Sequence, residues 1–188
     1  MQKRFALALS IVLLITGPVV HAEDPSSLLL TDDQIVLIKT NCLDTQSTLQ
    51  RVHSSDALAR FNLGQQYNII STNLMAPMNS RIALNKLDGV SLTQTTVTFN
   101  NEVDHFNAMY QQYEQTMQRA LKSNCKDEPV SFFDTINLAR DHRAAVRESV
   151  DTLNMLLKQY DAQLGVLKTA VAARTATAAT TATAGAGS

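Results

Sequence analysis

Two cysteines, Cys42 and Cys125, are the residues of this chain whose number and spacing most restrict their chemistry. A pair of thiols can form a disulfide, supply a nucleophile or bind a metal ion. Neither cysteine belongs to a CxxC motif or to a Cys/His cluster of the kind that a redox or zinc site uses. We therefore predict a Cys42–Cys125 disulfide and keep a reactive thiol or a metal pair as alternatives.

Asp56 and Arg143 are charged residues at positions where the surrounding pattern favours apolar side chains. An ion pair between them would compensate both charges inside a core, with Tyr110 or Tyr113 donating a hydroxyl hydrogen bond. Such a buried polar layer contributes more to register than to stability, because desolvation offsets the attraction. The alternatives are a polar layer that binds a ligand and simple partial exposure.

His53, Glu114 and His142 suggest a metal site, because helical register places them at similar heights. Each lies beside an apolar stripe and not within it, so we expect each to face water. The sequence lacks an HExxH motif and the paired ExxH motifs of di-iron bundles. It also lacks a nucleophile elbow and a phosphate-binding loop. We therefore predict no metal, no cofactor and no enzymatic activity.

The helices that would position these residues show apolar positions at alternating steps of four and three, the spacing of one helix face. The clearest series predicts an amphipathic helix of about 30 residues after Leu92. Alternation with period two, which marks a half-buried strand, is absent. The series consists of Leu92, Thr96, Phe99, Val103, Phe106, Tyr110, Tyr113, Met117 and Ala120.

A second series predicts a helix of about 40 residues after Pro129. Ser131 and Asp134 resemble a capping box at its start. Only Arg143 interrupts the stripe. The series consists of Phe132, Ile136, Ala139, Arg143, Val146, Val150, Leu153, Leu157, Tyr160, Leu164, Leu167 and Val171.

An earlier and more polar series predicts a first helix capped by Thr31. Pro77 lacks a backbone donor, so we expect it to kink or stop this helix near residues 74–76. A short helix or bent loop closed by Gly89 should follow. The series consists of Ile35, Ile38, Cys42, Thr45, Leu49, Val52, Asp56, Ala59, Leu63, Gln66 and Ile70.

Three long helices joined by short links bury their stripes by running up, down and up. If Cys42 faces Cys125, the turn between the first two helices falls halfway between them, where Pro77 and Gly89 independently bracket a bend. If the second helix ends at residue 125 and the third starts at 131, this register and that of the third helix together bring Asp56 and Arg143 to similar heights. We therefore predict an all-α fold, an elongated antiparallel up-down-up bundle of three long helices, coiled-coil-like.

The two ends of the chain differ in composition from this bundle. Residues 1–22 combine a basic start, an apolar run and a small residue before acidic ones, the pattern of a secretory signal peptide. We predict cleavage after Ala22, one bundle over residues 23–171 and no membrane span after cleavage. Residues 172–188 are rich in Ala, Thr and Gly, and we predict a disordered tail there.

The formal net charge of the chain is -1, without an acidic or basic block. A phosphate backbone or an anionic membrane surface would require a basic stripe, so we predict no nucleic-acid partner. Proteins, glycans and small molecules remain open as partners. The polar residues Thr45 and Gln66 in the first stripe leave a thin core that a second copy could complete, which makes a homo-oligomer a further expectation.

The stretches RVHSSDALARFNLGQQYNIISTNLMAPMNSRIALNK and CKDEPVSFFDTINLARDHRAAV resemble parts of uncharacterised secreted helical proteins of bacteria with reduced genomes. The resemblance implies a bacterial cell-envelope or extracellular setting and carries over no catalytic residues. We expect a secreted or cell-envelope protein that is not an enzyme and that acts in interaction, adhesion or spacing. The alternative is a helical bundle that binds a small molecule or a metal at its polar layer.

Overall fold

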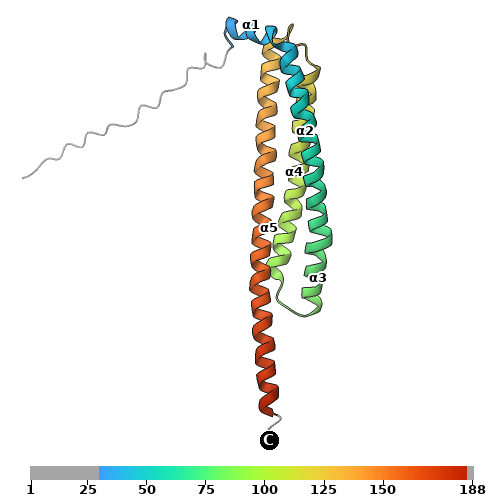
Figure 1. Ribbon diagram of the computed structural model, residues 1–188, viewed down its shortest axis with the longest axis vertical. Coiled ribbons are helices and arrows are strands. Elements are labelled where there is room, and N and C mark those ends of the chain that lie inside the picture. The colour runs from blue at the N-terminus through green and yellow to red at the C-terminus, as the bar shows by residue number, and fades with distance from the viewer. Residues whose placement is uncertain (1–29, 186–188) are drawn as a thin grey trace, which may run out of the picture.

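The structure, a computed structural model, describes the backbone of residues 30–185 and the side chains of residues 30–177. Its regular elements are all helices, and no β-strand occurs between residues 30 and 185, so the all-α class is confirmed. Long helices lie side by side in an elongated molecule (Figure 1). The predicted signal peptide, residues 1–22, lies outside the described residues.

The first predicted helix is broken at Asn41. α1 (Asp32–Thr40) lies across one end of the molecule, whereas α2 (Cys42–Ile69) runs along its length (Figure 1). The backbone N–H and the side-chain amide of Asn41 both donate to the carbonyl of Leu37. These local hydrogen bonds satisfy the end of α1 and let the chain change direction.

α2 continues through a π-helical turn, η2 (Ile70–Met75), into α3 (Ala76–Leu84). Pro77, which was predicted to kink or stop the helix, lies in the first turn of α3. In the widened turn before it, the N–H of Ala76 donates to the carbonyl of Ser71, five residues back. The π-helical turn takes up the misfit that the missing proline N–H creates, so the chain remains helical.

The turn after α3 places Lys86 in the left-handed region, with a φ of 55°. Gly89, predicted to close α3, is instead the N-cap of α4 (Val90–Lys122) and has a φ of -120°. A Cβ at position 89 would lie 2.5 Å from Cγ2 of Ile82, a buried side chain. Close packing, and not the backbone dihedral, therefore requires glycine here.

Gly89→Ala is expected to lower the free energy of unfolding by about 1 to 3 kcal/mol, because the branched Ile82 side chain must move out of its packed position. Urea-induced unfolding followed by circular dichroism measures the change. Gly64→Ala is the matched control: a Cβ there meets nothing within 4 Å. In the middle of α2 this change should stabilise by roughly 0.5 to 1 kcal/mol. Equal effects of the two substitutions would contradict the packing argument.

α5 (Pro129–Gly185) is the longest helix, and α4 packs mainly against it and less against α2. All nine predicted positions of α4 are buried, together with Thr95 and Thr116. The predicted stripe of α5 is buried at Phe132 and Leu153 but exposed at Arg143. α4 is thus the central helix that α2 and α5 share.

α5 begins at Pro129, a position where the missing N–H of proline costs no helical hydrogen bond. The predicted capping box of Ser131 and Asp134 is wrong. Ser131 lies inside the helix, and its carbonyl accepts from the Thr135 hydroxyl. Because the fixed φ of proline suits the first turn of a helix, α5 begins at Pro129, ahead of the cap predicted at Ser131.

A disordered tail was predicted for residues 172–188, whereas α5 remains helical through Gly185; residues 186–188 lie outside the described residues. Alanine has the highest helix propensity, and it dominates this segment. The hydroxyls of Thr175 and Thr177 donate to carbonyls of the preceding turn, at Val171 and Ala173. These bonds satisfy the threonine side chains within the helix.

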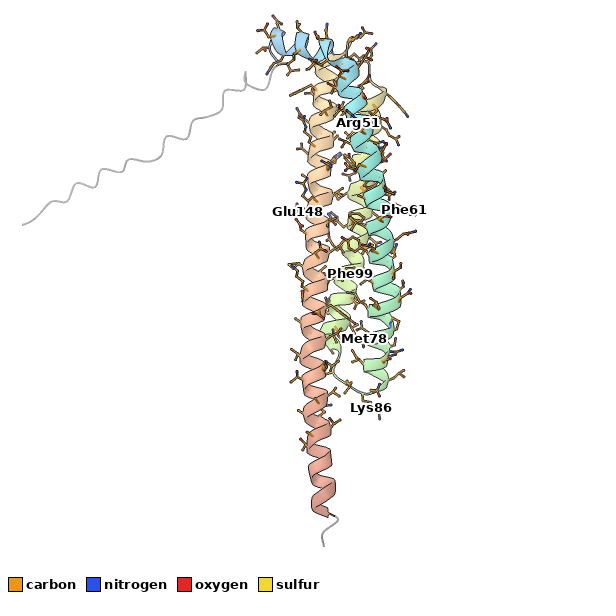
Figure 2. All side chains as sticks on the ribbon, in the orientation of Figure 1. Arg51, Phe61, Met78, Lys86, Phe99 and Glu148 are labelled. Carbon is orange, nitrogen blue, oxygen red and sulfur yellow. A yellow bond between two sulfur atoms is a disulfide. The ribbon has the colours of Figure 1, made fainter. Side chains whose placement is uncertain are left out.

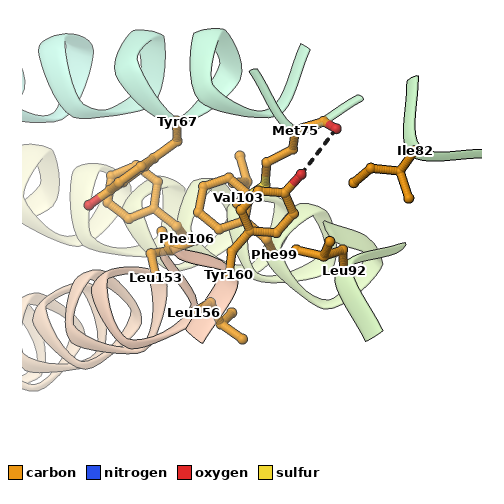
Figure 3. Packing of buried hydrophobic residues seen from close by; sticks show 10 residues of the cluster. All are labelled: Tyr67, Met75, Ile82, Leu92, Phe99, Val103, Phe106, Leu153, Leu156 and Tyr160. Carbon is orange, nitrogen blue, oxygen red and sulfur yellow. Dashed lines mark hydrogen bonds between the residues drawn. The ribbon is translucent and has the colours of Figure 1, made fainter. Parts of the chain in front are cut away.

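The main hydrophobic core lies between α2, η2, α3, α4 and α5 (Figure 3). The Tyr67 ring stands edge-on to Phe99 and Phe106, with centroid distances of 6.1 and 5.7 Å. The predicted stripe placed Gln66 in this position, but Gln66 is exposed and Tyr67 is buried. The neighbouring positions of the series, Leu63 and Ile70, do pack against this core, so only this one position was wrong.

Cys42 and Cys125 form a disulfide with a Cα–Cα distance of 5.6 Å. The bond joins the start of α2 to the segment that follows α4. Around it lies a second cluster of buried residues, Ala120, Phe132 and Ile136. In the described residues, no helix has the length and apolar character needed to cross a membrane.

Candidate functional site

Asp56 of α2, Tyr113 of α4 and Arg143 of α5 meet in the half of the bundle that is nearer to the disulfide. Arg143 donates from Nε to Oδ2 of Asp56 at 2.7 Å and from Nη2 to Oδ1 at 2.8 Å. The Tyr113 hydroxyl donates to Oδ2 of Asp56 at 2.6 Å. A single carboxylate therefore links all three long helices.

This polar layer is open to water, which differs from the buried pair predicted from the sequence. The Arg143 side chain is 47% exposed and the Asp56 side chain 19% exposed. Tyr113, by contrast, is fully buried. α2 and α5 both pack on α4 and hardly on each other. Arg143 therefore spans an open seam between α2 and α5 rather than a closed core.

Tyr110, the alternative donor predicted for Asp56, instead donates to Oε2 of Glu114 at 2.9 Å. Oε1 of Glu114 lies 2.8 Å from Nε2 of His53 and accepts from Gln118 at 2.8 Å. Helical register had placed His53 and Glu114 at the same height, but we expected both to face water. The second carboxylate therefore also links α2 and α4.

His142 does not join this second carboxylate. Its Nδ1 lies 3.1 Å from the hydroxyl of Thr116, which belongs to α4. The metal layer considered for His53, Glu114 and His142 is therefore not assembled. Among the residues with described side chains, no group of three His, Cys, Asp or Glu is placed to hold a metal ion.

Both carboxylates are held in the charged form. Burial by itself would raise the pKa of Asp56, but hydrogen bonds from Arg143 and Tyr113 outweigh it and hold the pKa below its ordinary value of 3.8. For Glu114, burial is likewise outweighed by hydrogen bonds, the largest from His53, and its pKa lies below 4.5. Both residues therefore act as fixed acceptors at neutral pH.

The two tyrosines are held in the neutral form. Burial and the hydrogen bond to Glu114 raise the pKa of Tyr110 to about 12. Burial and the hydrogen bond to Asp56 raise the pKa of Tyr113 well above its ordinary value. Both hydroxyls therefore stay donors at neutral pH, which suits binding better than proton transfer.

The stability of the protein is expected to fall as the pH drops through the depressed pKa values of Asp56 and Glu114. Their stabilisation is complete above the ordinary values of 3.8 and 4.5 and is lost on further acidification. Asp56→Asn removes one of these contributions, so its stability should change less between about pH 5 and pH 2. Urea unfolding across that range measures the slope, and parallel curves for both proteins would contradict the assignment.

A pocket of about 150 Å³ opens beside the polar layer, between α2, α4 and α5. Its floor is apolar, formed by Leu63, Phe106 and Val146. Arg60, also in the lining, places its guanidinium carbon 4.0 Å from the centre of the Tyr110 ring. The sequence offered one signal for Arg60: it follows Asp56 by four residues and so shares its helix face.

The mid-bundle residues therefore combine fixed hydrogen-bond donors, positive charge and a small apolar floor. Comparison of the chain with protein-family models, with curated proteins and with solved structures gives no match. The resemblance to secreted bacterial helical proteins stays a prediction.

Proposed function

We propose that this protein is a non-enzymatic spacer of a bacterial secreted or cell-envelope compartment, and that it works by pairing with a second copy. Its body is an antiparallel up-down-up bundle of coiled-coil type, built from α2 with its extension, α4 and α5. The Cys42–Cys125 disulfide supports an oxidising compartment. The 57 residues of α5 correspond to about 85 Å of helix, a length that supports a role in holding two partners apart.

An apolar groove between η2–α3 and α5 carries this proposal. It consists of two adjoining hollows of about 350 and 420 Å³ that share Met78 and Leu164 (Met78 is labelled in Figure 2). Tyr160 and Leu167 add further apolar lining from α5. An apolar groove of this shape favours the apolar face of a helix over a glycan, whose hydroxyls would lose water there.

The charges in the groove favour a second copy of this chain as the occupant. Asp161 lines one hollow, and Lys168 lines the other together with Arg81; on α5, Asp161 and Lys168 lie on either side of Leu164. If two α5 helices meet antiparallel around Leu164, Asp161 of each copy lies near Lys168 of the other. Twofold symmetry makes this contact twice, as in an isologous dimer.

Pairing at this end would produce a longer rod. The disulfide lies near the start of α5, about 50 Å from Leu164 at 1.5 Å per residue. Two copies joined around Leu164 would therefore hold their disulfide ends roughly 100 Å apart. A spacer with two equivalent, covalently stabilised ends follows from this arrangement.

Charge exchange tests the pairing without disturbing the core, because Asp161 and Lys168 are both exposed. Wild-type protein from an oxidising compartment should be dimeric by light scattering at micromolar concentration. Asp161→Lys and Lys168→Asp should each raise the dissociation constant about tenfold, the effect of roughly 1.4 kcal/mol. The double variant Asp161→Lys/Lys168→Asp should restore the dissociation constant of the wild type. Val166→Glu, at an exposed position outside the groove lining, is the control and should leave the dimer intact.

A wild-type protein that stays monomeric up to high micromolar concentration would overturn the proposal. A dimer that ignores both single charge changes would place the contact elsewhere on the molecule. Circular dichroism checks that every variant keeps its helix content, so that loss of pairing is separated from loss of fold.

A further inference from the structure

We propose that the mid-bundle pocket binds a small monocarboxylate with an apolar body, of about the size of benzoate. This site is separate from the apolar groove, since no residue lines both. The proposal rests on three features of the pocket: its charge, an unpartnered buried donor and its size.

The charge around the pocket is unbalanced. Arg60, Arg143 and Arg147 all line it, whereas Asp56 is the only carboxylate among the lining residues. Both oxygens of Asp56 are already engaged by Arg143, and Tyr113 adds a third hydrogen bond. Within the described part of the chain, Arg60 and Arg147 form no ion pair with a carboxylate. The rim therefore retains positive charge that an anion could neutralise.

The buried Nε of Arg60 has no hydrogen-bond acceptor. Stacking on the Tyr110 ring holds the guanidinium in place, and Tyr110 is itself fixed by its bond to Glu114. A buried donor normally has an acceptor, because burying a hydrogen-bonding group without a partner is unfavourable. The geometry therefore points to an acceptor that enters the pocket beside Arg60.

The volume of the pocket and its lining residues indicate which group the ligand should carry besides its carboxylate. A cavity of about 150 Å³ accommodates one benzene-sized group. Leu63, Phe106 and Val146 offer this group an apolar floor, while the arginines face the carboxylate at the rim. A bare inorganic anion would leave the floor without contacts, and a neutral aromatic would leave Nε of Arg60 without an acceptor. A compact aromatic or branched aliphatic monocarboxylate satisfies both.

Two-dimensional NMR titration of the wild-type protein with benzoate, benzyl alcohol and inorganic phosphate tests the inference. Benzoate should shift the signals of Phe106 and Val146 with saturation in the millimolar range. Benzyl alcohol, which has the same ring without the charge, should bind at least tenfold more weakly. Phosphate should not displace benzoate at equal concentration.

Arg60→Gln should weaken benzoate binding at least tenfold, because it removes the charge and the Nε donor. Arg51→Gln is the matched control, since Arg51 is an exposed arginine of α2 that bonds to Thr48 and does not line the pocket. It should bind benzoate as the wild type does.

Absence of benzoate-induced shifts at the pocket in the wild type would overturn the inference. Equal affinity for benzyl alcohol would also overturn it, because the anion would then be irrelevant. The wild-type comparison of these two probes does not depend on whether Arg60→Gln folds. Since Asp161→Lys disturbs only the groove, it should leave benzoate binding unchanged, which separates this inference from the proposed dimer.

Discussion

Replacing both Cys42 and Cys125 by Ser is expected to lower the free energy of unfolding by about 4 to 5 kcal/mol. The bond spans 83 residues of sequence, so it removes a large part of the conformational freedom of the unfolded chain. It also closes the end of the molecule where α1 turns away from α2 (Figure 1). Without the bond, a small buried cluster and the hydrogen bonds from Gln46 to the carbonyls of Leu121 and Ser123 hold the start of α2.

Urea unfolding of the wild type under oxidising and reducing conditions measures the contribution of the disulfide. Dithiothreitol should reduce the stability of the wild type to that of the double variant and leave the double variant unchanged. The comparison with dithiothreitol separates the loss of the disulfide from any packing cost of the two serines. A difference below about 1 kcal/mol would mean that the reduced chain already retains the hairpin.

Phe106→Ala is expected to lower the free energy of unfolding by about 3 to 5 kcal/mol, the range for truncating a fully buried phenylalanine. Phe106 is 0% exposed and lies in the core beside Tyr67 and Leu153 (Figure 3). The edge-on contact with Tyr67 would also be lost. Because Phe106 contributes to the floor of the mid-bundle pocket, the cavity left behind should merge with that pocket.

Phe61→Ala is the control for this experiment. Phe61 has the same side chain but is 56% exposed on the outer side of α2 (Figure 2). Its truncation should change the stability by less than about 1 kcal/mol. Chemical denaturation of the two variants under identical conditions gives the comparison. Similar losses at both positions would show that burial in this core is not what stabilises the fold.

Hydrophobic periodicity predicted most of α4 correctly, because this helix is covered on one face along its whole length. All nine positions of its predicted stripe are buried. The same periodicity was less accurate for α2, where Gln66 was expected in the core and Tyr67 occupies it. Leu63 and Ile70, on either side of this position, both pack against the core, so the helix takes a step of four and then three where the series took three and then four.

The two cysteines allowed the register of the first two helices to be inferred, and the short link between residues 125 and 131 gave the register of the third. That inference brought Asp56 near Arg143, and the two form a bidentate pair. Exposure could not be inferred in this way. Whether a charged pair is buried depends on how closely α2 and α5 approach each other, and both pack on α4 instead.

What the chain alone determined, therefore, is its helical class, the face that α4 buries and the heights of the pairs that cross between helices. These depend on short-range spacing and on one covalent link. Only the tertiary structure decided where α1 turns away, which side of the polar layer stays open and which acceptor Arg60 lacks. Those features depend on the distances between helices, which arise from the packing of many side chains and leave no local pattern in the sequence.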